Sequence, residues 1–469
     1  MQVTSFRAQA LHRLPLAAML SLAFAGASQA QSLQDIYDMA RGYDAAYQSA
    51  KAQYDANLAK ADQGKAALLP SVGLTAGATR SGRMQVPHIF PVGSVTDSNF
   101  SYTTQTAGVN ATQPLYRPAN LATYRQSQKG LALADAALSQ AEQDLLVRVS
   151  QAYFDVLSSQ DSLAFVQAQK AAVAEQLASA KRNFEVGTAT ITDTREAQAR
   201  FDLVVAQEIA ADNDLRVKKV ALELLVGKNG LKPQSLKAGT ALPSVDGQGV
   251  DDWIAQSEAT HPAIQLARAN LDVAKLETEK AVAGHKPTVD LTLGYNAQKN
   301  FTGTATGALP SSIPNGISQI NIASVGVAVN LPLFAGLATQ NRIKETTALE
   351  EKARMDLEGA QRQVAQATRT AYLGLQSGLG QVKAYEAAEA SSQVALDANK
   401  LGYQVGVRIN IDVLNAQSQL FQTKRDLSVA RYNVLLGGLR LRQAAGTLSA
   451  EDLQQVNAAL GAAPAAAKP

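Results

Sequence analysis

The chain consists of two tandem copies of one unit, and this repeat constrains its fold more than any single motif does. Aligned against each other, the halves match at an offset of 217 residues near Gly77, 218 near Gly108 and 219 near Gly187. The one-residue slips fall between segments, as loop insertions should. We predict a first repeat over residues 31–227, a linker over residues 228–252, a second repeat over residues 253–446, and a C-terminal segment and tail over residues 447–469.

The first 30 residues are typical of a secretory signal peptide. A basic segment ending at Arg13 precedes the apolar residues 14–25, and Ser28 and Ala30 place small residues where signal peptidase needs them. An inner-membrane anchor is the alternative, but a spanning helix needs roughly 20 apolar residues. Cleavage after Ala30 leaves 41 Lys and Arg against 40 Asp and Glu. This near-neutral balance argues against nucleic acid as the main partner.

Each repeat contains a pair of segments in which apolar and polar residues alternate. The apolar face of the second pair consists of Val289, Leu291, Leu293, Tyr295, Val325, Val327, Val329, Leu331 and Leu333. A period of two predicts strands, and segments of about 10 residues suit a tilted membrane-spanning strand. Residues 81–99 and 299–318, rich in Gly, Pro, Ser and Thr, are expected to be exposed loops. A soluble β-hairpin is the alternative interpretation of the same alternation.

The rest of each repeat is predicted to be helix of unusual length. From residue 119 to residue 186 there is no Pro, and Gly130 is the only Gly. A helix over about 119–184 would be ~100 Å long at 1.5 Å per residue. Apolar residues recur at spacings of four and three over residues 145–184, and the same seam returns over residues 364–403. This heptad pattern predicts coiled-coil packing in both halves.

Both long helices are expected to end in a sharp reversal. Gly187 and Gly406 are the residues suited to the left-handed conformation that stops a helix. Asp193 with Glu196 fits the capping pattern that starts the returning helix, and Asp412 repeats this arrangement. Each repeat is therefore predicted to be a strand pair, a long outgoing helix, a tight turn and a returning helix.

Four strands cannot close a pore by themselves. Single-chain bacterial barrels start at eight strands, and unpaired strand edges cannot face lipid. Several chains must therefore combine, with two giving eight strands and three giving twelve strands and room for a lumen. The predicted fold class is α plus transmembrane β: long α-helical hairpins in tandem repeat, forming a coiled-coil tunnel, attached to strands that contribute to a shared barrel.

The order and spacing of these features resemble the TolC family of trimeric outer-membrane efflux and secretion ducts. The likeness runs from Ser32 to about Leu460 and includes the stretch GYQVGVRINIDVLNAQSQLFQTKRDLSVARYNVLLGGLRLRQAAGTLS. It implies a homotrimer with a twelve-stranded barrel in the outer membrane of a Gram-negative bacterium, a periplasmic helical tunnel and a closed periplasmic tip. The implied partners are outer-membrane lipid, a periplasmic adaptor (membrane fusion) protein, an inner-membrane ABC or proton-driven transporter, and an exported protein or small-molecule cargo. No cofactor is implied.

The same resemblance places a selectivity site at the periplasmic entrance. Asp412 matches the first acid of the family's pattern DVLDA, whose carboxylates ring the tunnel mouth and select cations. Asn415 stands where the second acid would be, so a trimer would carry three carboxylates there instead of six. From the residues alone, helix capping is the alternative role for Asp412, and one carboxylate can serve both purposes.

The resemblance also places gating links at the tip. Arg408 and Tyr403 match positions that hold the inner helix pair against the neighbouring outer pair, with Thr192 and Asp193 as the expected partners. A solvated Arg and a heptad Tyr are the alternatives. Opening would then be a rotation of the hairpin over residues 375–422 that breaks these contacts.

The residues offer no catalytic or metal site. The chain has no Cys, which excludes disulfides, thiol nucleophiles, Cys-ligated zinc and a lipidated N-terminal Cys. No His pair has metal-ligand spacing, and no phosphate loop or nucleophile elbow occurs. We therefore predict a non-enzymatic exit duct for a tripartite efflux pump or a type I secretion system. A periplasmic or surface coiled-coil scaffold or adhesin without a pore is the alternative.

Overall fold

The computed structural model describes most of the chain. The described residues are 30–88, 96–237, 242–243, 247, 249–306 and 317–461. The predicted signal peptide, apart from Ala30, and the end of the predicted tail lie outside them. Among the described residues, every helix is too short or too polar to cross a bilayer.

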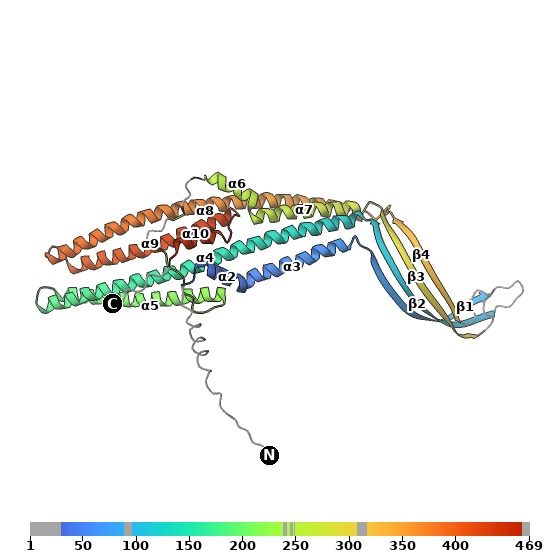
Figure 1. Ribbon diagram of the computed structural model, residues 1–469, viewed down its shortest axis with the longest axis horizontal. Coiled ribbons are helices and arrows are strands. Elements are labelled where there is room, and N and C mark those ends of the chain that lie inside the picture. The colour runs from blue at the N-terminus through green and yellow to red at the C-terminus, as the bar shows by residue number, and fades with distance from the viewer. Residues whose placement is uncertain are drawn as a thin grey trace, which may run out of the picture. The chain divides into compact units, whose positions relative to one another are not determined.

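The chain divides into two compact units, and each takes residues from both halves of the sequence. The first unit comprises the chain up to Ser49, Ser139–His261 and Gln363–Pro469, and the second comprises Ala50–Leu138 and Pro262–Arg362. Two of the four boundaries between the units fall inside α4 (Pro118–Glu185) and α8 (Ala338–Gln404), the two longest helices (Figure 1). The predicted repeat boundaries thus describe a relation in sequence, and as domain limits they stay a prediction.

The second unit contains a four-stranded antiparallel sheet in the order β1-β2-β3-β4. Its strands are β1 (Ser71–His88), β2 (Thr96–Tyr116), β3 (Thr288–Thr306) and β4 (Ile317–Asn330). At 14 to 21 residues they exceed the expected length of about 10. Much of the predicted loops is in fact strand, because pairing with the neighbouring strand satisfies the backbone of these Ser- and Thr-rich segments.

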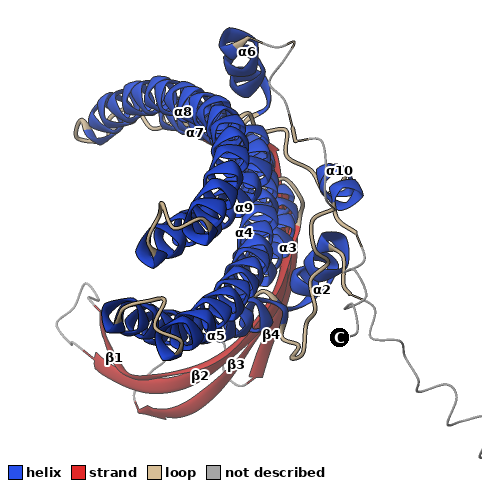
Figure 2. Cartoon of the chain, turned by 90° about the vertical axis from the view of Figure 1, so that its left-hand side faces the viewer, coloured by secondary structure: helices blue, strands red, loops and turns tan. Residues whose placement is uncertain are grey.

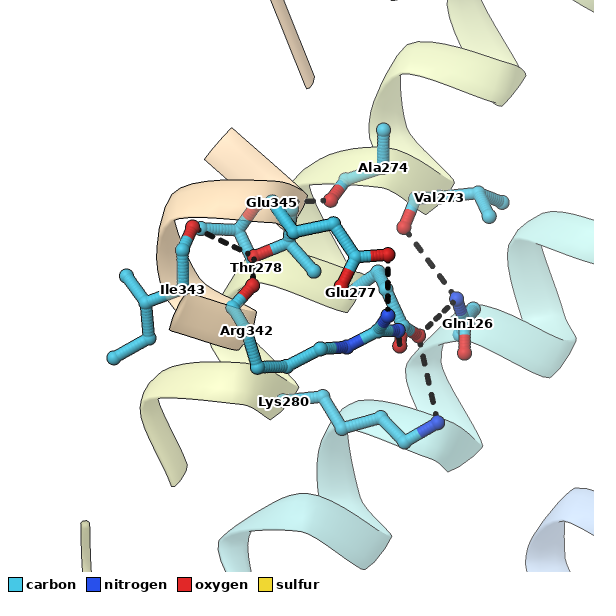
Figure 3. Close-up of polar contacts among 10 residues, drawn as sticks. Gln126, Val273, Ala274, Glu277, Thr278, Lys280, Arg342, Ile343 and Glu345 are labelled. Carbon is cyan, nitrogen blue, oxygen red and sulfur yellow. Dashed lines mark hydrogen bonds and ion pairs between the residues drawn. The ribbon is translucent and has the colours of Figure 1, made fainter. Parts of the chain in front are cut away.

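Helices of the second unit are held together by a polar cluster around Glu277 (Figure 3). The helices of this unit are most of α3 (Ala45–Ala66), α7 (Pro262–Ala283) and the first parts of α4 and α8, and the cluster joins α4, α7 and α8. Glu277 of α7 accepts hydrogen bonds from Arg342 of α8 at 2.7 Å, from Gln126 of α4 at 3.2 Å and from Lys280 at 3.4 Å. Burial favours a higher pKa for Glu277, but the hydrogen bonds from Arg342 and Gln126 and the nearby Lys280 hold that pKa below its usual value. The ionised carboxylate therefore joins three helices.

The first unit is helical. It contains α2 (Leu33–Tyr43), α5 (Ile191–Val226), α6 (Val250–Thr260), α9 (Asn410–Ala444), α10 (Asp452–Ala459) and the later parts of α4 and α8. Most apolar members of the predicted heptad seams are buried, namely Leu145, Val149, Val156, Val173, Leu177, Ala180, Val364, Leu375, Val382 and Leu396. Tyr432 of α9 stacks on Phe154 of α4 with ring centroids 5.9 Å apart. The predicted fold of long helical hairpins joined to four strands is confirmed.

Candidate functional site

Two turns end the α4/α5 and α8/α9 hairpins, and they lie at the left-hand ends of these hairpins in Figure 1. Gly187 and Gly406 have φ angles of 75° and 79°, the left-handed conformation that glycine adopts without strain. The amide of Thr188 donates to the carbonyl of Asn183 at 2.8 Å, and the amide of Val407 donates to the carbonyl of Gly402 at 2.9 Å. These backbone bonds close the last turn of each outgoing helix. The two repeats thus build the same helix end.

The returning helix α5 begins with a complete capping box. Its N-cap is Thr190, whose hydroxyl accepts from the amide of Asp193 at 3.2 Å. The carboxylate Oδ2 of Asp193 accepts from the amide and the hydroxyl of Thr190, at 2.9 and 2.8 Å. Asp193 is therefore the N3 residue of the box, the third residue of the helix, and not the N-cap predicted from the sequence. Thr192, the other expected gating partner, is exposed beside it.

The returning helix α9 begins without a side-chain cap. Its N-cap is Ile409, which has no side-chain oxygen, so Asp412 in the first turn has no hydroxyl with which to form a box. Capping is consequently the wrong role for Asp412. Its Oδ2 instead lies 3.7 Å from Nη1 of Arg408, with both side chains partly exposed. An acid in the first turn is favourable beside the helix N-terminus, and an exposed ion pair of this length contributes little.

Asn410 joins the two hairpins from a fully buried position at the start of α9. Its Nδ2 donates to the backbone carbonyl of Asp193 at 3.4 Å, and its Oδ1 accepts from Nε2 of Gln176. The sequence reasoning missed this residue. A signal was available, since the equivalent position in the first repeat is Ile191, a residue with 48% exposure. A polar residue that replaces an apolar one in a single repeat indicates a contact made by that repeat alone.

Polar contacts also cross between the hairpins at other positions. Nδ2 of Asn183 donates to the hydroxyl of Tyr403 at 3.3 Å, and Nη2 of Arg200 donates to Oδ1 of Asn415 at 2.7 Å. Farther from the turns, Nε2 of Gln169 donates to the hydroxyl of Ser418 at 3.3 Å. Tyr403 and Arg408 thus have partners within their own chain other than Thr192 and Asp193. The predicted links to a neighbouring subunit stay a prediction.

An apolar layer lies beneath these polar contacts. Leu414 of α9 is fully buried in a cluster with Val173, Leu177, Ala180, Ala197 and Val204 of α4 and α5. On its other side α9 packs against α8, with Val413 and Leu420 against Leu396. Figure 2 shows the helices in blue and the connecting turns in tan. Near the turns, the α8/α9 hairpin therefore rests on α4/α5 through this apolar layer and side-chain hydrogen bonds. A neutral bond of this kind is worth about 0.5–1.5 kcal/mol, and the bond from the charged Arg200 is worth more.

The described residues contain no group of three or more His, Asp or Glu side chains placed to hold a metal ion. Asp412, Asn415, Arg408 and Tyr403 all lie within or beside the α8/α9 turn. The site consists of separable contacts between helical hairpins, an arrangement suited to movement.

The chain matches a family described as outer membrane efflux protein, over residues 36–228 and 253–447. It is 34% identical over 431 residues to the outer membrane protein TolC of Vibrio cholerae, covering 92% of this chain and 94% of that protein. It is 31% identical over 443 residues to the alkaline protease secretion protein AprF of Pseudomonas aeruginosa, covering 92% and 87% of the two chains. The crystal structure of the outer membrane protein VceC from Vibrio cholerae shares the fold, with a TM-score of 0.70, 20% identity and coverage of 88% and 96%.

Proposed function

Because the chain belongs to the outer membrane efflux protein family, and so is a protein of the Gram-negative outer membrane, we propose that three copies form the exit duct of an export system. The system is a tripartite efflux pump, a type I secretion system, or both. The names of the relatives, an efflux family and a protease secretion protein, support both uses. Family membership favours this duct over a scaffold or adhesin without a pore.

The main support for this proposal is that both edges of the sheet are open. β1 and β4 are edge strands, and one face of the sheet is apolar and exposed, as Leu74 at 77% and Val325 at 74% illustrate. An exposed apolar face with unpaired backbone at both edges is unstable alone in water or in lipid. Three copies that pair edge to edge remove all free edges and turn the apolar face to lipid.

The duct opens at the helical turns. The α8/α9 hairpin rotates away from the α4/α5 hairpin, and the contacts that must break include Asn183–Tyr403, Arg200–Asn415 and the bonds of Asn410. Links from Arg408 and Tyr403 to Thr192 and Asp193 of a neighbouring copy would hold the closed state further. In a trimer, three Asp412 carboxylates at the entrance would concentrate cations.

The remaining components act on this duct from the periplasm and the inner membrane. A periplasmic adaptor protein binds the helical hairpins, and an ABC or proton-driven transporter supplies the energy for export. The cargo is an exported protein or a small molecule. The chain's own role is passive, since it provides the path and the gate.

Conductance in a planar lipid bilayer tests the proposal. The purified protein should form channels that favour cations, and Asp412→Ala should shift the reversal potential toward zero in a salt gradient. Asp202→Ala is the matched control, because it removes the same charge from the outer hairpin, where Asp202 accepts from Gln198 at 2.9 Å. If the protein forms no channels in the bilayer, the proposed duct is wrong. If the two variants have equal ion selectivity, the proposed role of Asp412 is wrong.

A further inference from the structure

The internal repeat extends to the strand register. Val72 pairs with Ala111 across β1 and β2, and the residues 217 and 218 positions later, Val289 and Val329, pair across β3 and β4. The same holds for Leu74 with Val109, which corresponds to Leu291 with Val327. The two hairpins are therefore copies in pairing as well as in sequence.

The pairing between the hairpins has no counterpart within one chain. β2 pairs with β3, and the equivalent pair is β4 with β1. These two strands are the opposite edges of the sheet, about three strand spacings or ~14 Å apart. The counterpart can form only when β4 meets β1 of another copy.

We infer that β4 pairs antiparallel with β1 of a second copy of this chain in one defined register, Val327 opposite the partner subunit's Ala78. The register follows from the pair Val109 and Tyr295 across β2 and β3, whose repeat equivalents are Val327 and Ala78. It runs from Ser324 opposite the partner subunit's Ser81 to Asn330 opposite the partner subunit's Thr75. This inference rests on the proposed function, which already brings the sheet edges of neighbouring copies together, and adds to it the register in which they pair.

The faces of the sheet agree with this register. Val325, Val327 and Val329 lie on the exposed apolar face, at 74%, 62% and 66% exposure. The register sets Val327 and Val329 beside the partner subunit's Ala78 and the partner subunit's Ala76, which belong to the same face as Leu74. A slip of one residue would turn one strand over and mix the apolar and polar faces. A slip of two residues keeps the faces, so the repeat is what selects among the remaining registers.

The junction between strands and helices differs at the two kinds of pairing. Within the chain, Arg117 at the end of β2 forms a bidentate ion pair with Asp290 of β3, at 2.7 and 2.6 Å. The equivalent positions at the pairing between copies are Ala335 and the partner subunit's Gly73. The pairing between copies therefore depends on backbone hydrogen bonds and side-chain packing, without an equivalent ion pair. Its specificity comes from the register.

Disulfide cross-linking measures this register directly, because the chain has no cysteine of its own. Directly opposed residues have Cα atoms about 4.5–5.5 Å apart, within disulfide reach, whereas residues displaced by two are about 7–8 Å apart. The double variant Ala78→Cys/Val327→Cys should give covalent dimers and trimers on non-reducing denaturing gels after oxidation. Reductant should return these bands to monomer. Thr79→Cys/Gly326→Cys probes the same register on the opposite face, in case the first variant misfolds.

The matched controls displace one cysteine by two residues. Ala76→Cys/Val327→Cys and Arg80→Cys/Val327→Cys should yield at least fivefold less cross-linked product. Val109→Cys/Tyr295→Cys should close a disulfide within one chain and remain monomeric on the gel.

The failure of the register and the failure of the duct give different results. Efficient cross-linking of a displaced pair, or a trimer in which neither matched pair reacts, would overturn the register and leave the duct intact. A protein that is monomeric by light scattering, silent in bilayers and unreactive in every pair would overturn the proposed function itself.

Discussion

Arg200 of α5 donates a hydrogen bond from Nη2 to Oδ1 of Asn415 on α9, and the two atoms lie 2.7 Å apart. This contact ties the α4/α5 hairpin to the α8/α9 hairpin close to their turns. Asn415 is the position at which the sequence departs from a second entrance acid. Its side chain is engaged by an arginine of the same chain, so an acid at this position would enter an ion pair and not stand free.

Asn415→Asp should stabilise the closed arrangement. The change turns the bond from the charged Arg200 into an ion pair, and an exposed ion pair contributes about 0.2–1 kcal/mol per subunit. Single-channel recording should show a lower open probability than that of the native protein. The double variant Arg200→Gln/Asn415→Asp should restore openings, and an unchanged open probability in the single variant would contradict the link.

Asn410→Ala should destabilise the first unit by about 1–3 kcal/mol, because it leaves the carbonyl of Asp193 and the amide of Gln176 without their partner. Asn399→Ala is the matched control, since that side chain donates to Ala395 within its own helix. Denaturant unfolding in detergent should separate the two variants. Equal stabilities would show that the buried bonds of Asn410 have no net value.

Gly402→Ala should loosen the α8/α9 turn. An added Cβ would lie 2.7 Å from Cγ and 3.3 Å from Cβ of Arg408, so the turn must shift. Hydrogen exchange measured by mass spectrometry should be faster in peptides covering residues 403–410. Gly380→Ala, on the same helix with nothing within 4 Å of the added atom, should instead be neutral or stabilising by up to ~1 kcal/mol. Similar exchange in both variants would be the contrary result.

The ion pair between Arg117 and Asp290 should show strong coupling in a double-mutant cycle. Asp290 is 14% exposed, so Arg117→Ala leaves a largely buried carboxylate unpaired at a cost of about 1–3 kcal/mol. The variant Arg117→Ala/Asp290→Ala should lose less stability than the sum of the two single changes. Strictly additive losses in unfolding experiments would mean that the pair contributes nothing as a unit.

Stability in acid should depend on Glu277. Burial favours a higher pKa, but the bonds from Arg342 and Gln126 and the nearby Lys280 hold it below the ordinary value of 4.5. A depressed folded-state pKa contributes stability that is fully present above the unfolded value and is lost as the pH falls through the folded one.

Glu277→Gln should therefore lower stability at neutral pH and flatten the loss of stability below about pH 4.5. Thermal unfolding measured across this pH range gives the stability of each variant. Glu279→Gln, which alters the more exposed pair with Arg125 at 3.5 Å, should follow the native curve closely. A native-like acid profile in Glu277→Gln would refute the role of this cluster.

The repeat, the kind and order of the elements, and the position of the turns are all predictable from the order of the residues. These features depend on local rules. Strands alternate with a period of two, coiled-coil helices follow a heptad, and glycine alone enters the left-handed conformation freely. Gly187 and Gly406 accordingly stand at the helix ends, and the buried seams follow the predicted spacing.

Which side chains meet depends instead on how the helices pack in the folded chain. The partners of Tyr403, Asn410 and Asn415 lie more than 200 residues away in the chain. A periodic pattern predicts which face of a helix is apolar, but it does not predict the axial offset between two packed helices. A polar side chain reaches its partner on the other helix only at one such offset. The full length of the strands also depends on tertiary contacts, because Ser- and Thr-rich segments become strands when a neighbouring strand supplies their backbone hydrogen bonds.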